Sequence, residues 1–219
     1  MRIFAIHAAG QASIIARGTA AAALALAVAA CGSSSPGAAP AASGTSSTHH
    51  PMASHSATAA SATFGSDCGM IPATGMGSLH GMSMDPVVTA ASHDPLLTTL
   101  AREVKAAGLG GELNSMTAVT VFAPANTAFS KLSSHEMSMM HGRAELAKIL
   151  KYHVVSGSIT PAKLASGMTL KTLEGGALKA AKMGAVYEVN NAHVLCGNIR
   201  TANATVYIID TVLMPMHMH

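Results

Sequence analysis

Apolar and polar positions alternate most clearly over TAVTVFAPANTAFSKL, residues 117–132. The β-branched and aromatic residues at 119–123 predict a buried strand. Pro124 has no N–H to donate to a neighbouring strand, so we expect the strand to end there. Asn126 or Thr127 can cap the short helix that follows, whose apolar side chains recur at a spacing of three. The stretch predicts a strand that turns directly into a helix packed back against it.

Helix signals surround this unit on both sides. Asp85-Pro86 and Asp94-Pro95 each place a capping residue before a proline, which predicts two helices upstream. Downstream, Ser133 and Glu136 have the spacing of a capping box. Residues 144–152 then show helical periodicity, and Thr160-Pro161 begins a further short helix.

From Met168 onward the periodicity changes to that of strands. Gly-Gly, Lys-Met-Gly, Asn-Asn and Thr-Ala-Asn breakers separate five runs: MTLKTL (168–173), ALKAAKM (177–183), AVYEV (185–189), AHVLCGNIR (192–200) and TVYIIDTVLM (205–214). A helix-rich first half followed by a series of antiparallel strands predicts one α+β domain.

The N-terminal segment has the pattern of an export signal. Arg2 and Arg17 supply positive charge, and Thr19–Ala30 is apolar but too short to span a bilayer. The segment ends in Val-Ala-Ala before Cys31, which resembles a bacterial lipobox, so residues 1–30 are predicted to be a lipoprotein signal peptide and Cys31 the lipidated residue. The alternative is an ordinary secretory signal cut near Ala30.

Composition divides the rest of the chain. Residues 31–66 are rich in Ser, Ala, Pro and His, with little to bury, and are expected to form a disordered tether. Residues 67–84 form a Met/Gly-rich arm, residues 85–215 the folded domain, and residues 216–219 a Met/His tail.

Charge and motifs argue against several function classes. The net charge of +3 falls to +1 without residues 1–30, which hold two arginines and no acid. The remaining chain has no contiguous basic stretch, so nucleic-acid binding is not expected. No Gly-x-Ser-x-Gly elbow, phosphate-binding glycine loop or obvious pair of acids is present, and we expect no enzyme activity and no cofactor.

Three cysteines occur in the chain. With Cys31 carrying lipid, Cys68 and Cys196 remain as a pair in an oxidising compartment, where a structural disulfide is expected. A redox-active or metal-binding thiol pair is the alternative, although the chain has no Cys-x-x-Cys motif.

Three segments resemble the fasciclin domain family. TVFAPANTAF resembles its first signature motif, AKILKYHVVSG (147–157) its second core element, and NATVYIIDTVLMP (203–215) its closing hairpin. The lipobox and the two cysteines also resemble actinobacterial cell-surface fasciclin lipoprotein antigens. One departure is Tyr207, where many relatives carry His. The resemblance implies a compact two-sheet β-wedge with helices packed along it.

The family is known mainly for adhesion and matrix binding at cell surfaces. The resemblance therefore implies a non-catalytic, monomeric module that binds an extracellular protein or a matrix or envelope component. It would be exported and would touch the membrane through its lipid anchor only.

Tyr152 and His153 have two interpretations. In animal relatives the matching pair is associated with receptor binding, so the resemblance makes this pair, with Asn126 of the first motif, a candidate adhesion site. Alternatively, His153 shares a helix face with Leu146 and Ile149 and is a core residue whose ring nitrogens bond to backbone.

Twelve His and fifteen Met are dense for 219 residues, and they cluster. Thioether and imidazole ligands suit Cu(I) or Ag(I), so an alternative function is envelope copper or silver binding. The alternative assumes that the clusters are exposed; otherwise Met merely fills space. The candidate ligands are Met82, Met84, His135, Met137, Met139, Met140, His141, Met214, Met216, His217, Met218 and His219.

Overall fold

The computed structural model describes residues 62–215. The predicted signal peptide, Cys31, the tether as far as residue 61 and the tail 216–219 lie outside the described residues. Within the described range, no helix is long and apolar enough to cross a bilayer.

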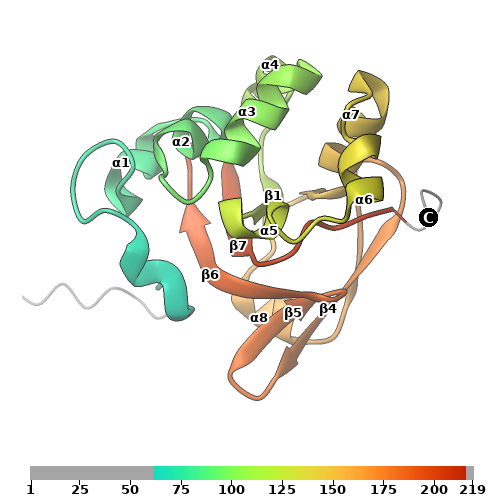
Figure 1. Ribbon diagram of the computed structural model, residues 1–219. Helices are drawn as coiled ribbons and strands as arrows, with labels where there is room; N and C mark the ends of the chain where they lie inside the picture. Colours follow the sequence, from blue (N-terminus) through green and yellow to red (C-terminus); the bar gives the residue numbers. More distant parts are fainter. Residues whose placement is uncertain (1–61, 216–219) are drawn as a thin grey trace, which may run out of the picture. The chain divides into compact units, whose positions relative to one another are not determined.

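Seven strands form the sheet of the described chain (Figure 1): β1 Val119–Pro124, β2 Val154–Ser156, β3 Thr169–Lys171, β4 Ala177–Met183, β5 Val186–Val189, β6 Ala192–Arg200 and β7 Ala204–Ile209. Their hydrogen-bonded order is β2-β1-β7-β6-β5-β4-β3. The edge strands β2 and β3 are themselves joined by a bridge between Val155 and Thr172 and by the Leu173 N–H donating to the Val154 carbonyl at 2.8 Å. The strands therefore close into a wedge. The two sheets that were expected are two parts of one continuous seven-stranded sheet.

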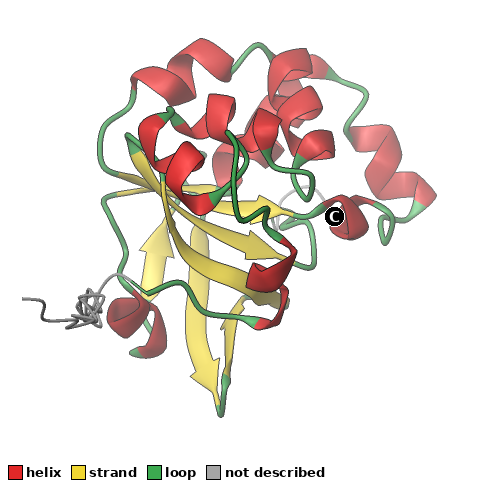
Figure 2. Ribbon diagram, turned by 90° about the vertical axis from the view of Figure 1, so that its left-hand side faces the viewer, coloured by secondary structure: helices red, strands yellow, loops and turns green. Residues whose placement is uncertain are grey.

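The helices of the described chain pack against this wedge. They are α1 Leu79–Met84, α2 Val87–His93, α3 Thr98–Ala107, α4 Gly110–Ser115, α5 Asn126–Phe129, α6 Ser134–Met139, α7 Arg143–Tyr152 and α8 Pro161–Ala165, with a 3-10 helix η1 at Ser66–Met70. Figures 1 and 2 show α1–α7 gathered at one end of the strands and the β4–β5 hairpin projecting at the other. The α+β class and the fasciclin wedge are confirmed.

The predicted strand–helix unit is the centre of the fold. All six residues of β1 are buried, and α5 follows after a single residue. β1 pairs antiparallel with β2 but parallel with β7, with Phe122 beside Tyr207. The sequence indicated antiparallel strands only. Parallel pairing is possible because the long segment between β1 and β7 provides the crossover that two parallel strands need.

Two upstream helices begin later than their proline signals predicted. α2 starts at Val87, whose N–H donates to Asn203 Oδ1 at 2.8 Å. α3 starts at Thr98 rather than beside Asp94, because Asp94 Oδ1 accepts from the Leu96 N–H in a tight turn before the helix. The helix signals further along are confirmed: α6 has the Ser133–Glu136 capping box, and α8 is capped by Thr160.

The strand runs also agree, with one exception. β4 and β6 coincide with their predicted runs. β7 ends at Ile209, short of the predicted Met214. At the next residue, the Asp210 N–H still donates to the His193 carbonyl at 3.0 Å, but the His193 N–H donates at 2.9 Å to the Asp210 carboxylate instead of to its backbone carbonyl.

The arm is more than a segment pinned by a disulfide. Cys68 and Cys196 are bonded, as expected, with Cα atoms 4.9 Å apart. In addition, Phe64 pairs with Gly197 of β6, although Phe64 lies within residues 31–66, which were predicted to be tether. Met82 of α1 is 2% exposed within the main hydrophobic core. Residues 64–84 are therefore part of the folded body.

Candidate binding site

His153 lies at the C-terminal end of α7 and is 2% exposed. Its Nε2 accepts from the Leu213 N–H at 2.9 Å, so Nδ1 carries the proton and donates to the Ile149 carbonyl at 2.8 Å. Burial lowers the pKa of His153 to about 4, despite the opposing bond to Ile149. The ring is therefore neutral and saturated by two backbone groups, as its structural interpretation requires, and it has no free nitrogen to act as a base.

Tyr152 is buried as well. Its hydroxyl donates to the Ala177 carbonyl of β4 at 3.0 Å and accepts from the Asn190 side chain at 3.3 Å. The bond from Tyr152 to Ala177 connects the end of α7 to β4. The bond between His153 and Leu213 connects it to the segment after β7. Neither side chain of the pair is accessible to a partner in this conformation.

Asn126 does not cap α5, whose capping residue is Ala125 without a side-chain bond. Its side chain instead reaches α3. Asn126 Oδ1 accepts from the Thr99 N–H at 2.9 Å, and Nδ2 donates to the Pro95 carbonyl at 2.8 Å. The first-turn N–H groups of a helix lack intrahelical partners, so Asn126 caps α3 from a distant part of the chain. Asn126 thus has an internal structural role, which sequence reasoning placed on the wrong helix.

A groove of about 570 Å³ lies beside the β4–β5 hairpin. Phe64 and Tyr187 line it, with ring centroids 4.3 Å apart, together with Val186 and Leu195. Sequence reasoning missed this groove because its walls come from the arm and from β5 and β6. One available signal was that the chain has only four Phe and three Tyr, so two aromatic rings that are only partly buried are notable.

Asp210 is the acid of this groove. Its Oδ2 lies 3.1 Å from Lys131 Nζ and 3.5 Å from His193 Nδ1. Partial burial opposes ionisation, but the bonds from the His193 N–H and from Lys131 outweigh it and hold the pKa of Asp210 below its usual range. The carboxylate is thus fixed and ionised, suited to positioning a ligand and poorly suited to donating a proton.

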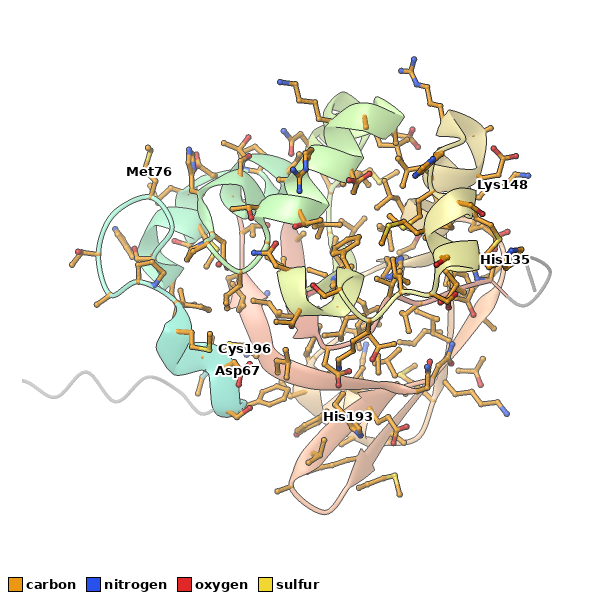
Figure 3. All side chains as sticks on the ribbon, viewed as in Figure 1. Asp67, Met76, His135, Lys148, His193 and Cys196 are labelled. Atoms are coloured by element: carbon orange, nitrogen blue, oxygen red, sulfur yellow. A yellow bond between two sulfur atoms is a disulfide. The ribbon has the colours of Figure 1, made fainter. Side chains whose placement is uncertain are left out.

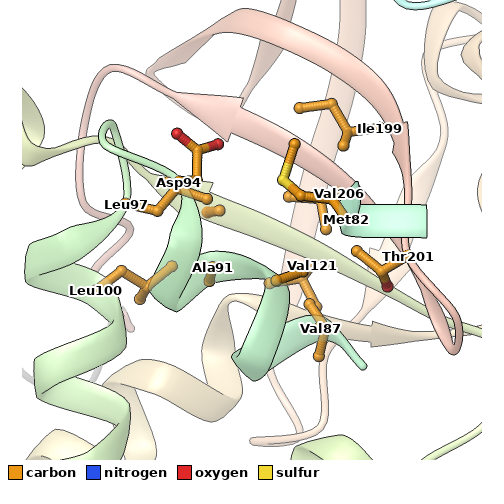
Figure 4. A pocket seen from close by; sticks show the side chains of 12 residues that line it. Met82, Val87, Ala91, Asp94, Leu97, Leu100, Val121, Ile199, Thr201 and Val206 are labelled. Carbon is orange, nitrogen blue, oxygen red and sulfur yellow. The ribbon is translucent and has the colours of Figure 1, made fainter. Parts of the chain in front are cut away.

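A much smaller cavity, of about 20 Å³, lies between α2, α3 and the sheet (Figure 4). It is apolar except for Thr201 and Asp94, and Asp94 is fully buried with no hydrogen-bond partner for its Oδ2. Burial raises the pKa of Asp94, although the bond from Leu96 opposes the rise. The space suits a single water molecule and is too small for a substrate.

The structure divides the Met and His candidates. The expectation that the inter-helix and C-terminal clusters are exposed is wrong for Met140 and Met214, which pack against the core, and Met82 of the arm lies within that core. Met84 is 71% and Met137 46% exposed. His135 and His141 are exposed and Met139 is half-buried, whereas Met216, His217, Met218 and His219 lie outside the described residues.

The exposed clusters do not converge. Figure 3 shows Met76 and His135 at opposite sides of the described body. In residues 62–215, no group of three or more His, Cys, Asp or Glu is placed to hold a metal ion. Met214 does border a cavity of about 290 Å³ that Glu136 of α6 also lines.

Comparison with known proteins identifies the family. The fasciclin domain matches residues 95–215, more than half of the chain, and the chain belongs to this family. It is 44% identical over 152 residues to "Immunogenic protein MPB70" of Mycobacterium bovis, covering 65% of this chain and 75% of that protein. It is 43% identical over 152 residues to "Cell surface glycolipoprotein MPT83" of Mycobacterium tuberculosis, covering 65% and 66%.

A solved structure agrees on the fold. The similar chain is a FAS1 domain pair from the insect cell adhesion molecule fasciclin I, with a TM-score of 0.53 and 17% identity. The match covers 63% of this chain and 53% of that one, so this chain spans about half of the insect domain pair. At this identity the likeness shows the fold alone.

Proposed function

We propose that this protein is an exported, lipid-anchored surface module that binds an envelope or matrix component without catalysing a reaction. The groove beside the hairpin carries the proposal. It combines two aromatic rings in contact, tilted by 39°, and aliphatic walls with one carboxylate that is already fixed by hydrogen bonds. Concave apolar surface with few, fixed polar groups is typical of binding sites.

The anchor is proposed from the lipobox-like sequence before Cys31 and from the similarity to a cell-surface glycolipoprotein. One acyl chain gives only marginal membrane attachment, whereas several together hold a protein firmly. The disulfide between Cys68 and Cys196 is consistent with an exported protein.

Fractionation of a bacterial host that exports and acylates lipoproteins tests the anchor. The full chain should remain with the membranes, and the Cys31→Ser variant should appear in the medium or the soluble envelope fraction. Wild-type protein that is released as freely as the variant would contradict lipid anchoring.

A pull-down tests the groove. The released Cys31→Ser chain serves as bait against host matrix and against the cell's own envelope. Tyr187→Ala in that bait should lower capture at least tenfold, because it removes one of the two aromatic rings that line the groove. The matched control is Met137→Ala on α6, an exposed apolar residue outside the groove lining. Equal capture by both variants would exclude the groove as the binding site.

A second candidate function is Cu(I) binding, favoured by the exposure of Met84 and Met137. Thioether groups at the surface are free to coordinate a soft cation. Titration of the full chain with Cu(I) against a competing chelator tests it, and weak or stoichiometrically undefined binding is the negative result. Deletion of residues 216–219 should weaken copper binding and leave adhesion intact.

A further inference from the structure

The β4–β5 hairpin ends in an exposed apolar tip, which we define as Met183–Val186. Met183 and Val186 pair across the two-residue turn, so their side chains stand on the same face. They are 67% and 44% exposed. Gly184 supplies the positive φ, 63°, that a tight turn of this kind needs. Nothing in residues 62–215 covers the tip, which projects beyond the rest of the wedge (Figure 2).

Lysines flank this tip. Lys179 is exposed two pleats behind Met183 and therefore on the same face of β4. Lys182 stands on the opposite face, with its Nζ 5.0 Å from the centre of the Tyr187 ring. The nearest acid on β5 is Glu188, which is half-buried and pairs with His193 of β6. Two apolar side chains ahead of two lysines form the pattern of a segment that contacts an anionic bilayer surface.

The described chain begins on the same side of the wedge as the hairpin. Phe64 is fixed to Gly197 of β6 by two backbone hydrogen bonds of 3.2 and 2.7 Å, and its ring contacts Tyr187 of the hairpin. Gly65 lies so close to the Leu195 carbonyl that a Cβ atom would clash with it. The first described residues are therefore fixed beside the hairpin.

Thirty residues separate Cys31 from Ala62, the first described residue. Even fully extended they span no more than on the order of 100 Å. A tether of this length holds the domain near the bilayer at a high effective concentration. The hairpin offers only two apolar side chains and two lysines, which is too weak a contact to bring a free protein to the membrane. At the high effective concentration that the tether provides, the same contact forms.

We propose that the hairpin tip docks on the anionic lipid surface of the membrane that holds the anchor. Met183 and Val186 enter the boundary between headgroups and acyl chains, and Lys179 and Lys182 contact lipid phosphates. This inference rests on the proposed anchoring through Cys31 and adds an orientation to it. The tip faces the membrane, and helices α1–α7 face away from it.

Tryptophan fluorescence provides the test, because the chain contains no Trp. The full acylated chain carrying Val186→Trp is reconstituted into phosphatidylcholine vesicles with and without phosphatidylglycerol. We expect blue-shifted emission and quenching by lipids with brominated acyl chains, both stronger with phosphatidylglycerol. The matched variant Met137→Trp places the probe on α6 and should keep water-like emission without quenching.

Charge reversal sharpens the result. Lys179→Glu/Lys182→Glu in the Val186→Trp chain should lower the phosphatidylglycerol-dependent partitioning of the tip, read from the quenching, at least about thirtyfold, since each lysine near an anionic surface contributes about fivefold. Lys148→Glu, an exposed lysine on α7 away from the hairpin, is the control (Figure 3) and should leave quenching unchanged. An intact disulfide and an unchanged circular dichroism spectrum establish that each variant is folded.

Each outcome has a distinct meaning. Protein that fails to sediment with the vesicles refutes the proposed anchor. Protein that sediments while Val186→Trp stays unquenched leaves the anchor standing and overturns the lipid contact. Equal quenching of Val186→Trp and Met137→Trp overturns the orientation. A blue shift that appears only when envelope proteins are added assigns the tip to a protein partner instead.

Discussion

The residues around His153 are buried and stabilise the fold, whereas the exposed methionines lie at the surface of the described domain, outside its hydrophobic core. Tyr152 and His153 belong to a segment that carries the family resemblance, and both are buried with their polar atoms bonded. The large apolar side chains that the described structure leaves exposed are mostly methionines, in the arm, on α6 and at the hairpin tip. In this protein the family motif builds the fold, and the exposed surface lies in segments that the motif does not include.

The largest expected effect concerns the bond that joins the arm to the wedge. Cys68→Ala/Cys196→Ala opens a link between residues 128 positions apart. In the chain-entropy model, the free energy of unfolding should fall by about 4–5 kcal/mol. Urea denaturation measures it, and the wild type in reductant should reach the same stability. A reduced wild type as stable as the oxidised one would show that the bridge adds nothing.

Met82 and Met84 test the boundary between interior and surface on a single helix. They are two residues apart in α1 but 2% and 71% exposed. Met82→Ala should cost about 2–5 kcal/mol, since it leaves a cavity in the core. Met84→Ala should change stability by less than about 0.5 kcal/mol. Chemical denaturation of both variants checks the contrast, and similar losses would refute the placement of α1.

His153→Ala should lower the free energy of unfolding by about 3 kcal/mol, because two backbone partners lose their bond and a cavity opens. Binding per folded molecule should stay near the wild-type value, as measured by the groove pull-down at a temperature where both proteins are folded. Normal thermal stability in the variant would refute the structural role.

The same residue predicts a pH dependence. The pKa of His153 is about 4 in the folded protein, against an ordinary value of 6.5 in the unfolded chain. Its contribution is therefore fully present above pH 6.5 and is lost as the pH falls toward 4, by about 3 kcal/mol in total. Denaturation curves over that range should show a weaker pH dependence in His153→Ala.

Asn126→Ala should cost about 1–2 kcal/mol, because the Thr99 N–H at the start of α3 loses its acceptor. Asn126→Asp is the matched variant: it keeps the acceptor oxygen but loses the bond to the Pro95 carbonyl, so its loss should be smaller. Thermal unfolding of the two variants gives the comparison. Equal losses would show that the cap to α3 is not the main contribution.

The smallest expected effect is a gain. Asp94→Asn should stabilise the protein by about 1 kcal/mol at pH 7, since it removes a buried charge while keeping the acceptor for the Leu96 N–H. The pKa of Asp94 is raised in the folded state, so its ionisation destabilises the fold as the pH rises. The advantage of the variant should therefore shrink below pH 4. A variant less stable than wild type at pH 7 would contradict this account.

Local pattern was enough to predict several parts of the structure. The alternation in 119–123 predicted β1, the breakers after Met168 predicted β4 and β6, and the Ser133–Glu136 spacing predicted the cap of α6. These features depend on residues only a few positions apart. Short-range backbone geometry decides them wherever the chain is folded.

Only the tertiary structure decided the rest. The parallel pairing of β1 with β7, the capping of α2 by Asn203 and of α3 by Asn126, and the groove lined by Phe64 and Tyr187 all join residues far apart in sequence. Whether a methionine is core or surface, as for Met82 and Met84, also depends on what packs against it. Residue type and spacing along the chain do not specify which distant groups become neighbours, because packing of the whole domain selects them.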